Sequence, residues 1–220
     1  MLAPLPTSRG LLSAALLRSW TEGARLDLPT LRGVDARTDD DLHLALWACY
    51  QQHYGGFEGL PTSFEWDPPT IAFRGVLEAA FERALRVEHT QALPDDPVTA
   101  LRVIAEWSGP PLAATVEREG DRGHLIELAI HRSAYQLKEA DGHTFAIPRL
   151  SGPGRAALIE IQADEYGGGV PGRSHAELFA AAMVELGLDP SFGAYVDQLP
   201  GTTLATDNLV SLFALNRRLR

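Results

Sequence analysis

The chain has 220 residues, of which 45% are hydrophobic, and its formal net charge is -10. This length suits one domain or a domain in two parts, and the apolar content is enough for a core. The negative charge argues against binding to nucleic acid or to an anionic membrane, because phosphates would repel it. A single cysteine, Cys49, excludes an intrachain disulfide and a zinc site built from cysteines.

No run of the sequence approaches the roughly 18 apolar residues that a membrane span requires. The apolar stretch Leu11–Leu17 is too short for a signal peptide, and no small-residue cleavage motif follows it. We therefore expect no membrane association and a cytoplasmic location.

The first half of the chain has a helical period. Leu12, Leu16 and Trp20 fall at helical spacing and predict a first amphipathic helix. Capping and apolar signals predict three more helices, approximately over 39–54, 67–87 and 98–107. We expect residues 1–120 to form an N-terminal helical region that packs on the second half.

The second half, residues 121–220, is also helical in pattern, so the fold class expected is all-α. Helices are predicted over approximately 124–140, 155–166, 174–186 and 190–198, and in a final segment with Leu204, Asn208, Leu212, Leu215 and Leu219 on one side. Gly167-Gly168-Gly169 is read as a helix stop. Only Phe145–Ile147 is considered as a short extended segment.

Three residues on three predicted helices stand out as chemistry-bearing: Glu139, Glu165 and His175. His175 shares a helix face with Phe179 and Met183, so we expect its imidazole to point toward the core. Carboxylates that face inward need a partner, and iron held by carboxylates and histidine is how helical bundles build metal sites. The pattern alone favours the simpler alternatives, exposed glutamates and a hydrogen-bonded core histidine, because no Glu-x-x-His occurs.

Other polar residues favour structural roles. Glu78 and Glu82 alternate with an apolar stripe and are expected to be solvated. His53 is expected to pack among neighbouring tyrosines, and Cys49 to be a small core residue.

Several segments resemble the iron-containing redox enzymes, which are haem-oxygenase-like diiron oxidases. The segments are His131-Arg-Ser-Ala-Tyr-Gln-Leu-Lys-Glu-Ala-Asp, Ile147-Pro-Arg-Leu, Asp164-Glu-Tyr-Gly-Gly-Gly and His175-Ala-Glu-Leu-Phe. The resemblance implies a haem-oxygenase-like helical bundle.

The resemblance also implies a site. Glu139, Glu165 and His175 would be ligands of non-haem iron, in a centre that can be dinuclear, with Tyr166 beside them. O2 would be the co-substrate, an external partner would donate electrons, and the substrate would be a small amino-acid-like or fatty-acid-like molecule.

The chain departs from the family pattern at three places. Gly172 stands where the family often has another glutamate ligand, and Asn216 stands where a histidine is usual. The family's final core helix, which carries further ligands, would lie beyond Arg220. The sequence up to Arg220 reads as a helix that is not yet finished. We therefore expect at most about one weakly held iron per chain, since affinity follows the number of ligands.

The departures leave two alternatives open. One is a shortened or degenerate non-catalytic homologue that acts as a binding or assembly partner. The other is a thiaminase-like relative, which needs a nucleophilic cysteine in its pocket, and Cys49 is misplaced for that role. Apolar helix faces that would pack on the family's final core helix would be exposed to water without it. We therefore expect self-association or a partner chain to complete the bundle.

Overall fold

The computed structural model describes residues 2–88, 92–107, 109–110 and 112–219, and these residues are mostly helical. They contain no strand beyond one isolated parallel bridge between Ala3 and Phe57. The all-α prediction is therefore confirmed. The α-helices are, in chain order, α1 (Leu11–Glu22), α2 (Asp40–Tyr54), α3 (Pro68–Glu88), α4 (Pro97–Ala105), α5 (Leu112–Glu119), α6 (Arg122–Gln136), α7 (Asp141–Thr144), α8 (Gly152–Glu165), α9 (His175–Glu185) and α10 (Gly201–Leu215). Single 3-10 turns lie at Thr62–Trp66, Ile147–Arg149, Gly167–Gly169, Val196–Gln198 and Arg217–Leu219.

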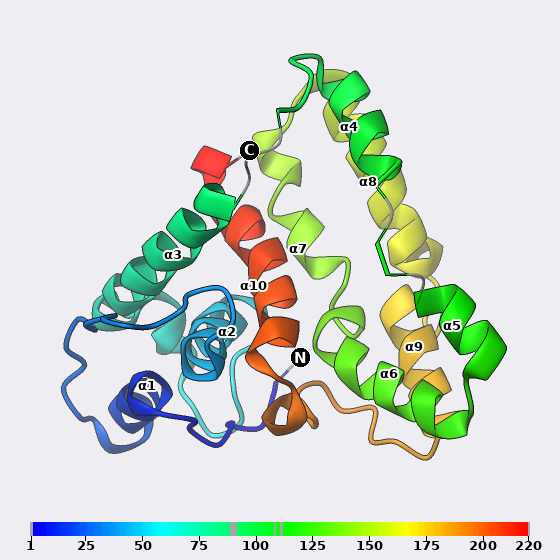
Figure 1. Ribbon diagram of the computed structural model, residues 1–220. Coiled ribbons are helices and arrows are strands. Elements are labelled where there is room, and N and C mark those ends of the chain that lie inside the picture. The colour runs from blue at the N-terminus through cyan, green and yellow to red at the C-terminus, as the bar shows by residue number, and fades with distance from the viewer. Residues whose placement is uncertain (1, 89–91, 108, 111, 220) are drawn as a thin grey trace.

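Helix α2 and helix α10 form the centre of the fold. In Figure 1, α10 lies between α2 and α3 on one side and α6 and α7 on the other. Every residue of α2 from Leu42 to Gln52 is buried. The side-chain amide of Asn208, on α10, donates to the backbone oxygen of His43 at 2.9 Å and fixes the register of the two helices.

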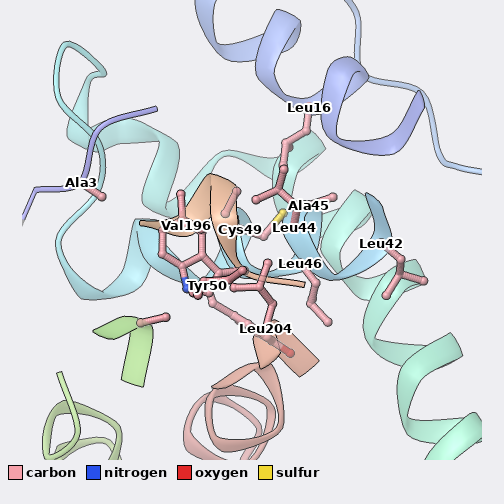
Figure 2. Close-up of a cluster of buried hydrophobic side chains, with 14 of the residues drawn as sticks. Ala3, Leu16, Leu42, Leu44, Ala45, Leu46, Cys49, Tyr50, Val196 and Leu204 are labelled. Atoms are coloured by element: carbon pink, nitrogen blue, oxygen red, sulfur yellow. The ribbon is translucent and has the colours of Figure 1, made fainter. Parts of the chain in front are cut away.

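The core on the other side of α2 is closed by α1. Figure 2 shows Leu16 of α1 directed at Ala45 and Cys49, with Leu204 of α10 on the opposite side. Cys49 is 1% exposed, so its prediction as a core residue is confirmed. Burial raises the pKa of this thiol to about 12, which leaves no thiolate for a thiaminase-like reaction.

The helix starts in the first half follow the capping residues. The Asp39 side chain accepts a hydrogen bond from the backbone N–H of Leu42 at 2.8 Å, and Asp67 accepts one from Thr70 at 2.9 Å. Each satisfies an orphan N–H group in a first helical turn. The predicted helices at these two places are confirmed within one residue.

Several predicted boundaries are wrong. Helix α5 was missed, because the proline-rich segment before it was read only as a stop, whereas proline is equally compatible with a helix start. Helix α6 ends at Gln136 and not at Ala140. The segment considered as extended is helical, with Phe145 in the right-handed region and a 3-10 turn at Ile147–Arg149. Of the predicted helix 190–198, only Val196–Gln198 is helical.

The end of α10 also differs from its prediction. The helix ends at Leu215, and Asn216 is extended at φ -99° and ψ 100°. The expected helix therefore does not continue past Leu215. Arg220 lies outside the described residues. The Asn216 amide donates to Glu78 at 3.2 Å and to the carbonyl of Leu212 at 3.1 Å.

Glu78 is buried, and the expectation that it is solvated is wrong. Its carboxylate lies 3.4 Å from the Arg74 guanidinium and accepts the hydrogen bond from Asn216. Opposite charge and a hydrogen bond compensate for the lost water. Glu82 remains partly exposed and pairs with Arg86 and Arg218, which fasten the end of the chain to α3.

Helices α8 and α9 present apolar side chains to solvent. Only Met183 is buried on α9, and Gln162 on α8. Four aliphatic residues on these helices are each about half exposed: Ile159, Ile161, Leu178 and Val184. Cover of these faces by a second copy or a partner chain stays a prediction. Within the described residues, no helix has the length and apolar character to cross a bilayer.

His53 packs against an aromatic ring, that of Trp66 where neighbouring tyrosines were expected, and its position makes stability depend on pH. The ring lies edge-on to Trp66 with centroids 5.1 Å apart, and it contacts the Arg74 guanidinium. Burial, with the Arg74 charge, lowers the pKa of His53 from 6.5 to about 4. Between these values the unfolded chain binds a proton that the folded chain does not, so stability falls as pH drops.

We expect the thermal midpoint to fall between pH 7 and pH 4.5, and to fall less in His53→Gln, which cannot take up the proton. Scanning calorimetry across this range measures both proteins. If the thermal midpoint falls equally with pH in His53→Gln and in the native chain, the pH dependence does not come from His53.

Candidate metal centre

Glu139, Glu165 and His175 come together at one place, although Glu139 does not lie in a helix as predicted and the other two lie at helix ends. Glu165 is the last residue of α8 and His175 the first of α9, while Glu139 lies in the turn after α6. One ligand atom from each residue lies within 4.8 Å of the others. The described residues contain no other group of three such side chains. The grouping is formed by segment ends, so it depends on what fixes those ends.

The turn that carries Glu139 is fastened from inside. Its neighbours Leu137, Lys138 and Ala140 are buried, and the backbone N–H of Lys138 donates to Tyr135 at 3.0 Å. Glu139 itself is half-buried and accepts a hydrogen bond from the Gln136 amide at 2.7 Å. The turn therefore holds one carboxylate at the surface of the core.

Lys138 is the anchor of this turn. Its ammonium lies 2.8 Å from Asp207 of α10, and both side chains are nearly fully buried. It also lies over the Tyr54 ring, 4.2 Å from the centroid. Burial raises the pKa of Asp207, and the charge of Lys138 opposes that rise. The pair ties the site to the central helix.

We expect Lys138→Met to destabilise the fold by about 3 to 5 kcal/mol, because it leaves Asp207 buried without a counter-charge. The double variant Lys138→Met with Asp207→Leu removes both charges and should recover much of this loss. Urea unfolding monitored by circular dichroism compares them. A single variant as stable as the native chain would show that the pair does not hold the turn.

Glu165 is positioned by Gln162, a residue that the sequence analysis did not select. The buried Gln162 amide donates to the carbonyl of Ala140 and to the hydroxyl of Thr144, both at 3.0 Å. Its oxygen lies 3.2 Å from Nδ1 of His143. These bonds dock α8 on α7 one helical turn before Glu165. The sequence could have indicated Gln162, because Gln162 and Glu165 are at i and i+3 and therefore share one helix face.

Gly167 lets the chain return from Glu165 to His175. Its φ is 62°, and a Cβ there would lie 2.4 Å from the backbone carbon of Arg173. Only glycine fits this close approach. The expectation that the three glycines stop the helix is confirmed, and the turn also brings the start of α9 beside the end of α8. Ser174 then caps α9 by accepting a hydrogen bond from the backbone N–H of Glu177 at 3.3 Å.

Gly167→Ala should destabilise this turn more than Gly168→Ala does. Both glycines have positive φ, so both variants bear the same backbone strain, but a Cβ at Gly168 meets nothing within 4 Å. Only the first variant must push Arg173 away. Amide hydrogen exchange over residues 165–180 should rise more in Gly167→Ala, and equal exchange in the two variants would contradict the close-approach argument.

His175 does not point into the core, contrary to the prediction, and its side chain is 44% exposed. Its Nδ1 lies 2.8 Å from Glu165 Oε2, and its Nε2 lies 4.0 Å from Asp164. The physical reason is its place at the first position of α9, where the helix has no core contact. Both ring nitrogens thus face carboxylates.

The second half of the chain is similar to a known protein family. Residues 126–220 match the family model described as iron-containing redox enzyme. Over these residues the chain is similar to that family. The resemblance seen in the sequence is confirmed over these residues, which include the three clustered side chains. No curated protein matches the chain.

The donor set fits the metal of the iron-containing redox enzymes. Two carboxylates and one imidazole are oxygen and nitrogen donors of the kind that iron accepts. Ligand distances near 2.1 Å place opposite ligands about 4.2 Å apart. The three atoms lie within 4.8 Å, so a shift of several tenths of an ångström lets them share one ion.

Two neighbours of the cluster have structural contacts of their own. The Tyr166 hydroxyl donates to Asp141 at 2.7 Å and thus braces the turn beyond Glu139, and its place beside the metal ligands stays a prediction. Gly172 has φ 78°, and its N–H donates to Glu177 at 3.0 Å. A family glutamate at this position would be strained. Among the described residues, no further carboxylate joins the cluster.

Tyr135, which the sequence analysis also passed over, lies on α6 beside the cluster. Burial raises the pKa of its hydroxyl, and the nearby charges of Glu139 and Glu165 raise it further. The same side chain lines a cavity between α5, α6 and α10. It therefore stands between the three ligand residues and a space large enough for a small molecule.

Proposed function

We propose that the chain is a non-haem iron oxidoreductase that uses O2 to oxidise a small amino-acid-like or fatty-acid-like substrate. The observation that carries the proposal is the convergence of Glu139, Glu165 and His175 within 4.8 Å. The similarity of residues 126–220 to the iron-containing redox enzymes supports iron as the metal.

The three residues would hold iron as two carboxylates and an imidazole, leaving positions open for exogenous ligands. Bound iron would supply the reduction of O2 and the oxidation of the substrate. Two carboxylates compensate the charge of a divalent ion, and Gln136 keeps Glu139 oriented by its hydrogen bond. An external electron donor would be needed between turnovers.

The residues around the cluster would control what reaches it. Tyr135 separates it from the neighbouring cavity, and Lys138 and Asp207 hold the turn of Glu139 against α10. His175 is reached from solvent. Iron and a partner that donates electrons would therefore approach from the side of α8 and α9.

The second candidate function is a non-catalytic binding or assembly partner. The exposure of His175 and the turn at Gly172 favour it, because three ligands with one in solvent hold a metal weakly. The half-exposed aliphatic residues of α8 and α9 offer a surface for a partner chain.

Metal content after anaerobic loading with Fe(II) separates the two functions. We expect up to about one iron per chain in the native protein, and at least about tenfold weaker binding in Glu165→Gln, because one charged ligand is lost. Glu160→Gln, on an exposed part of the same helix, is the matched control and should bind like the native chain.

The loaded protein should then consume O2 when a chemical reductant is added, and Glu165→Gln should not. Native protein that retains no more iron than Glu165→Gln would overturn the proposal in favour of the non-catalytic partner. Tight binding of two irons would contradict the expectation of about one.

A further inference from the structure

Helix α3 bears a groove of about 840 Å³, which lies between the helix and residues 29–37 and is called here the α3 groove. A pocket of about 410 Å³ lies beside it, at the end of the chain. Four residues line both and show that the two adjoin: Gly75, Ala79, Arg83 and Val87. In Figure 1, α10 separates α3 from α6 and α7, so this site is remote from the candidate metal centre. Its volume is in the range of small-molecule sites.

The floor of the α3 groove is made of small residues. Ala72, Gly75 and Ala79 lie at i, i+3 and i+7 on α3, where this spacing puts them on one helix face. All three are exposed, and Leu31 and Val34 line the groove from the preceding loop. With a rise of 1.5 Å per residue, the floor from Ala72 to Ala79 is about 10 Å long. The groove therefore has the shape and the apolar lining for an aliphatic chain.

Gly75 is a residue that the fold itself does not require. It lies in the middle of α3, where only proline is less favourable than glycine, and its φ is not in the left-handed region. A Cβ at this position would meet no heavy atom within 4 Å, so no close approach demands glycine. A larger side chain would instead fill the α3 groove and its pocket. Departures from local preference of this kind are typical of functional positions.

The pocket beside the groove, called here the arginine pocket, is lined by three guanidinium groups. Glu82 contacts both Arg86, at 2.8 Å, and Arg218, and its carboxylate thereby brings these two side chains to one point. Arg83 lines the same pocket, and within the described residues it takes part in no ion pair and no side-chain hydrogen bond. One of the three arginines is therefore left without a counter-charge.

The charges of the arginine pocket leave an excess of two positive charges. Three arginines face one ionised carboxylate, because hydrogen bonds from two of them lower the pKa of Glu82 to about 2. The other carboxylate of the lining, Glu78, is compensated by Arg74 at 3.4 Å. In the groove, Asp35 and Arg37 compensate each other at 3.3 Å. On a chain with a formal net charge of -10, this local excess attracts anions.

We propose that the α3 groove and the arginine pocket together bind a phosphate monoester of an aliphatic alcohol, at a site separate from the candidate metal centre. The phosphate group binds Arg83 and those N–H groups of Arg86 and Arg218 that Glu82 leaves free. The aliphatic chain lies on the floor formed by Ala79 and the residues before it. The inference goes beyond the proposed function, and the binding requires no iron.

Other ligand classes fit these observations less well. A phosphate monoester carries nearly two negative charges at neutral pH and matches the excess in the arginine pocket. A carboxylate or a sulfate ester carries one and leaves one guanidinium group without a counter-charge. Free phosphate compensates the charges but buries no apolar surface in the α3 groove. The preferred ligand therefore combines a dianionic head with an apolar chain.

Calorimetric titration of the metal-free full chain tests this at about pH 7.5, where a phosphate ester is mostly a dianion. The three probes are octyl phosphate, octyl sulfate, which has the same shape with one negative charge, and inorganic phosphate, which lacks the chain. We expect octyl phosphate to bind at least about tenfold more tightly than either of the others. Octyl phosphate that binds no more tightly than octyl sulfate, or than inorganic phosphate, would overturn the inference.

Two variants of one residue separate the ligand from the stability of the fold. Gly75→Ala and Gly75→Leu both replace a glycine inside a helix, so both should raise the thermal midpoint by about 2 to 4 °C. Only leucine fills the α3 groove. Gly75→Leu should therefore bind octyl phosphate at least about tenfold more weakly than Gly75→Ala does, and equal affinities would overturn the inference.

The arginine pocket is tested by Arg83→Gln, which should weaken octyl phosphate about tenfold and bring its affinity close to that of octyl sulfate. Arg102→Gln is the matched control, because it removes the same charge at an exposed position of α4 that lines neither the groove nor the pocket. Amide hydrogen exchange over residues 212–219 should also slow with octyl phosphate, because the ligand joins Arg218 to α3. An affinity for octyl phosphate that Arg83→Gln leaves unchanged would overturn the inference.

Discussion

The ion pair between Lys138 and Asp207 is the interaction on which the arrangement of the site depends. Two opposite charges, both nearly fully buried and 2.8 Å apart, join the turn after α6 to the central helix. Burial of each charge is costly, and the pair offsets that cost only in the geometry where the two meet. The ion pair thus favours one position of the turn over all others. This constraint also fixes the position of Glu139, which directly follows Lys138 in the sequence.

The two sides of the candidate site are held by different means. Glu139 depends on buried polar contacts, in which Gln162 bonds the carbonyl of Ala140 and thereby joins α8 to the same turn. His175 depends on a glycine turn and a helix cap at the surface. A metal that binds all three residues therefore orders the exposed side more than the buried one. The affinity for the metal includes the cost of that ordering.

Sequence patterns predicted most helices, because a capping residue and an apolar stripe are local signals, as at Asp39 and α2. They also singled out the three residues that the structure brings together, first by their places on predicted helices and then, more strongly, by the family resemblance. Periodicity continued α6 through Glu139, because a buried ion pair with α10 that is 69 residues away leaves no mark in the local sequence. The exposure of His175 could not be predicted for a related reason. The apolar face of its helix is visible in the sequence, but the sequence does not show whether another helix covers that face.

Asn216 shows how a departure from a family pattern can be reconciled with the structure. Its amide bonds a buried carboxylate, that of Glu78, and closes the end of α10. An amide donates this hydrogen bond at every pH, whereas a histidine would do so in a manner that depends on its tautomer and charge. The residue that the sequence marks as a lost family histidine therefore contributes to the core between α3 and α10. Its role is separate from the cluster of Glu139, Glu165 and His175, so the substitution by itself is no argument against metal binding at that cluster.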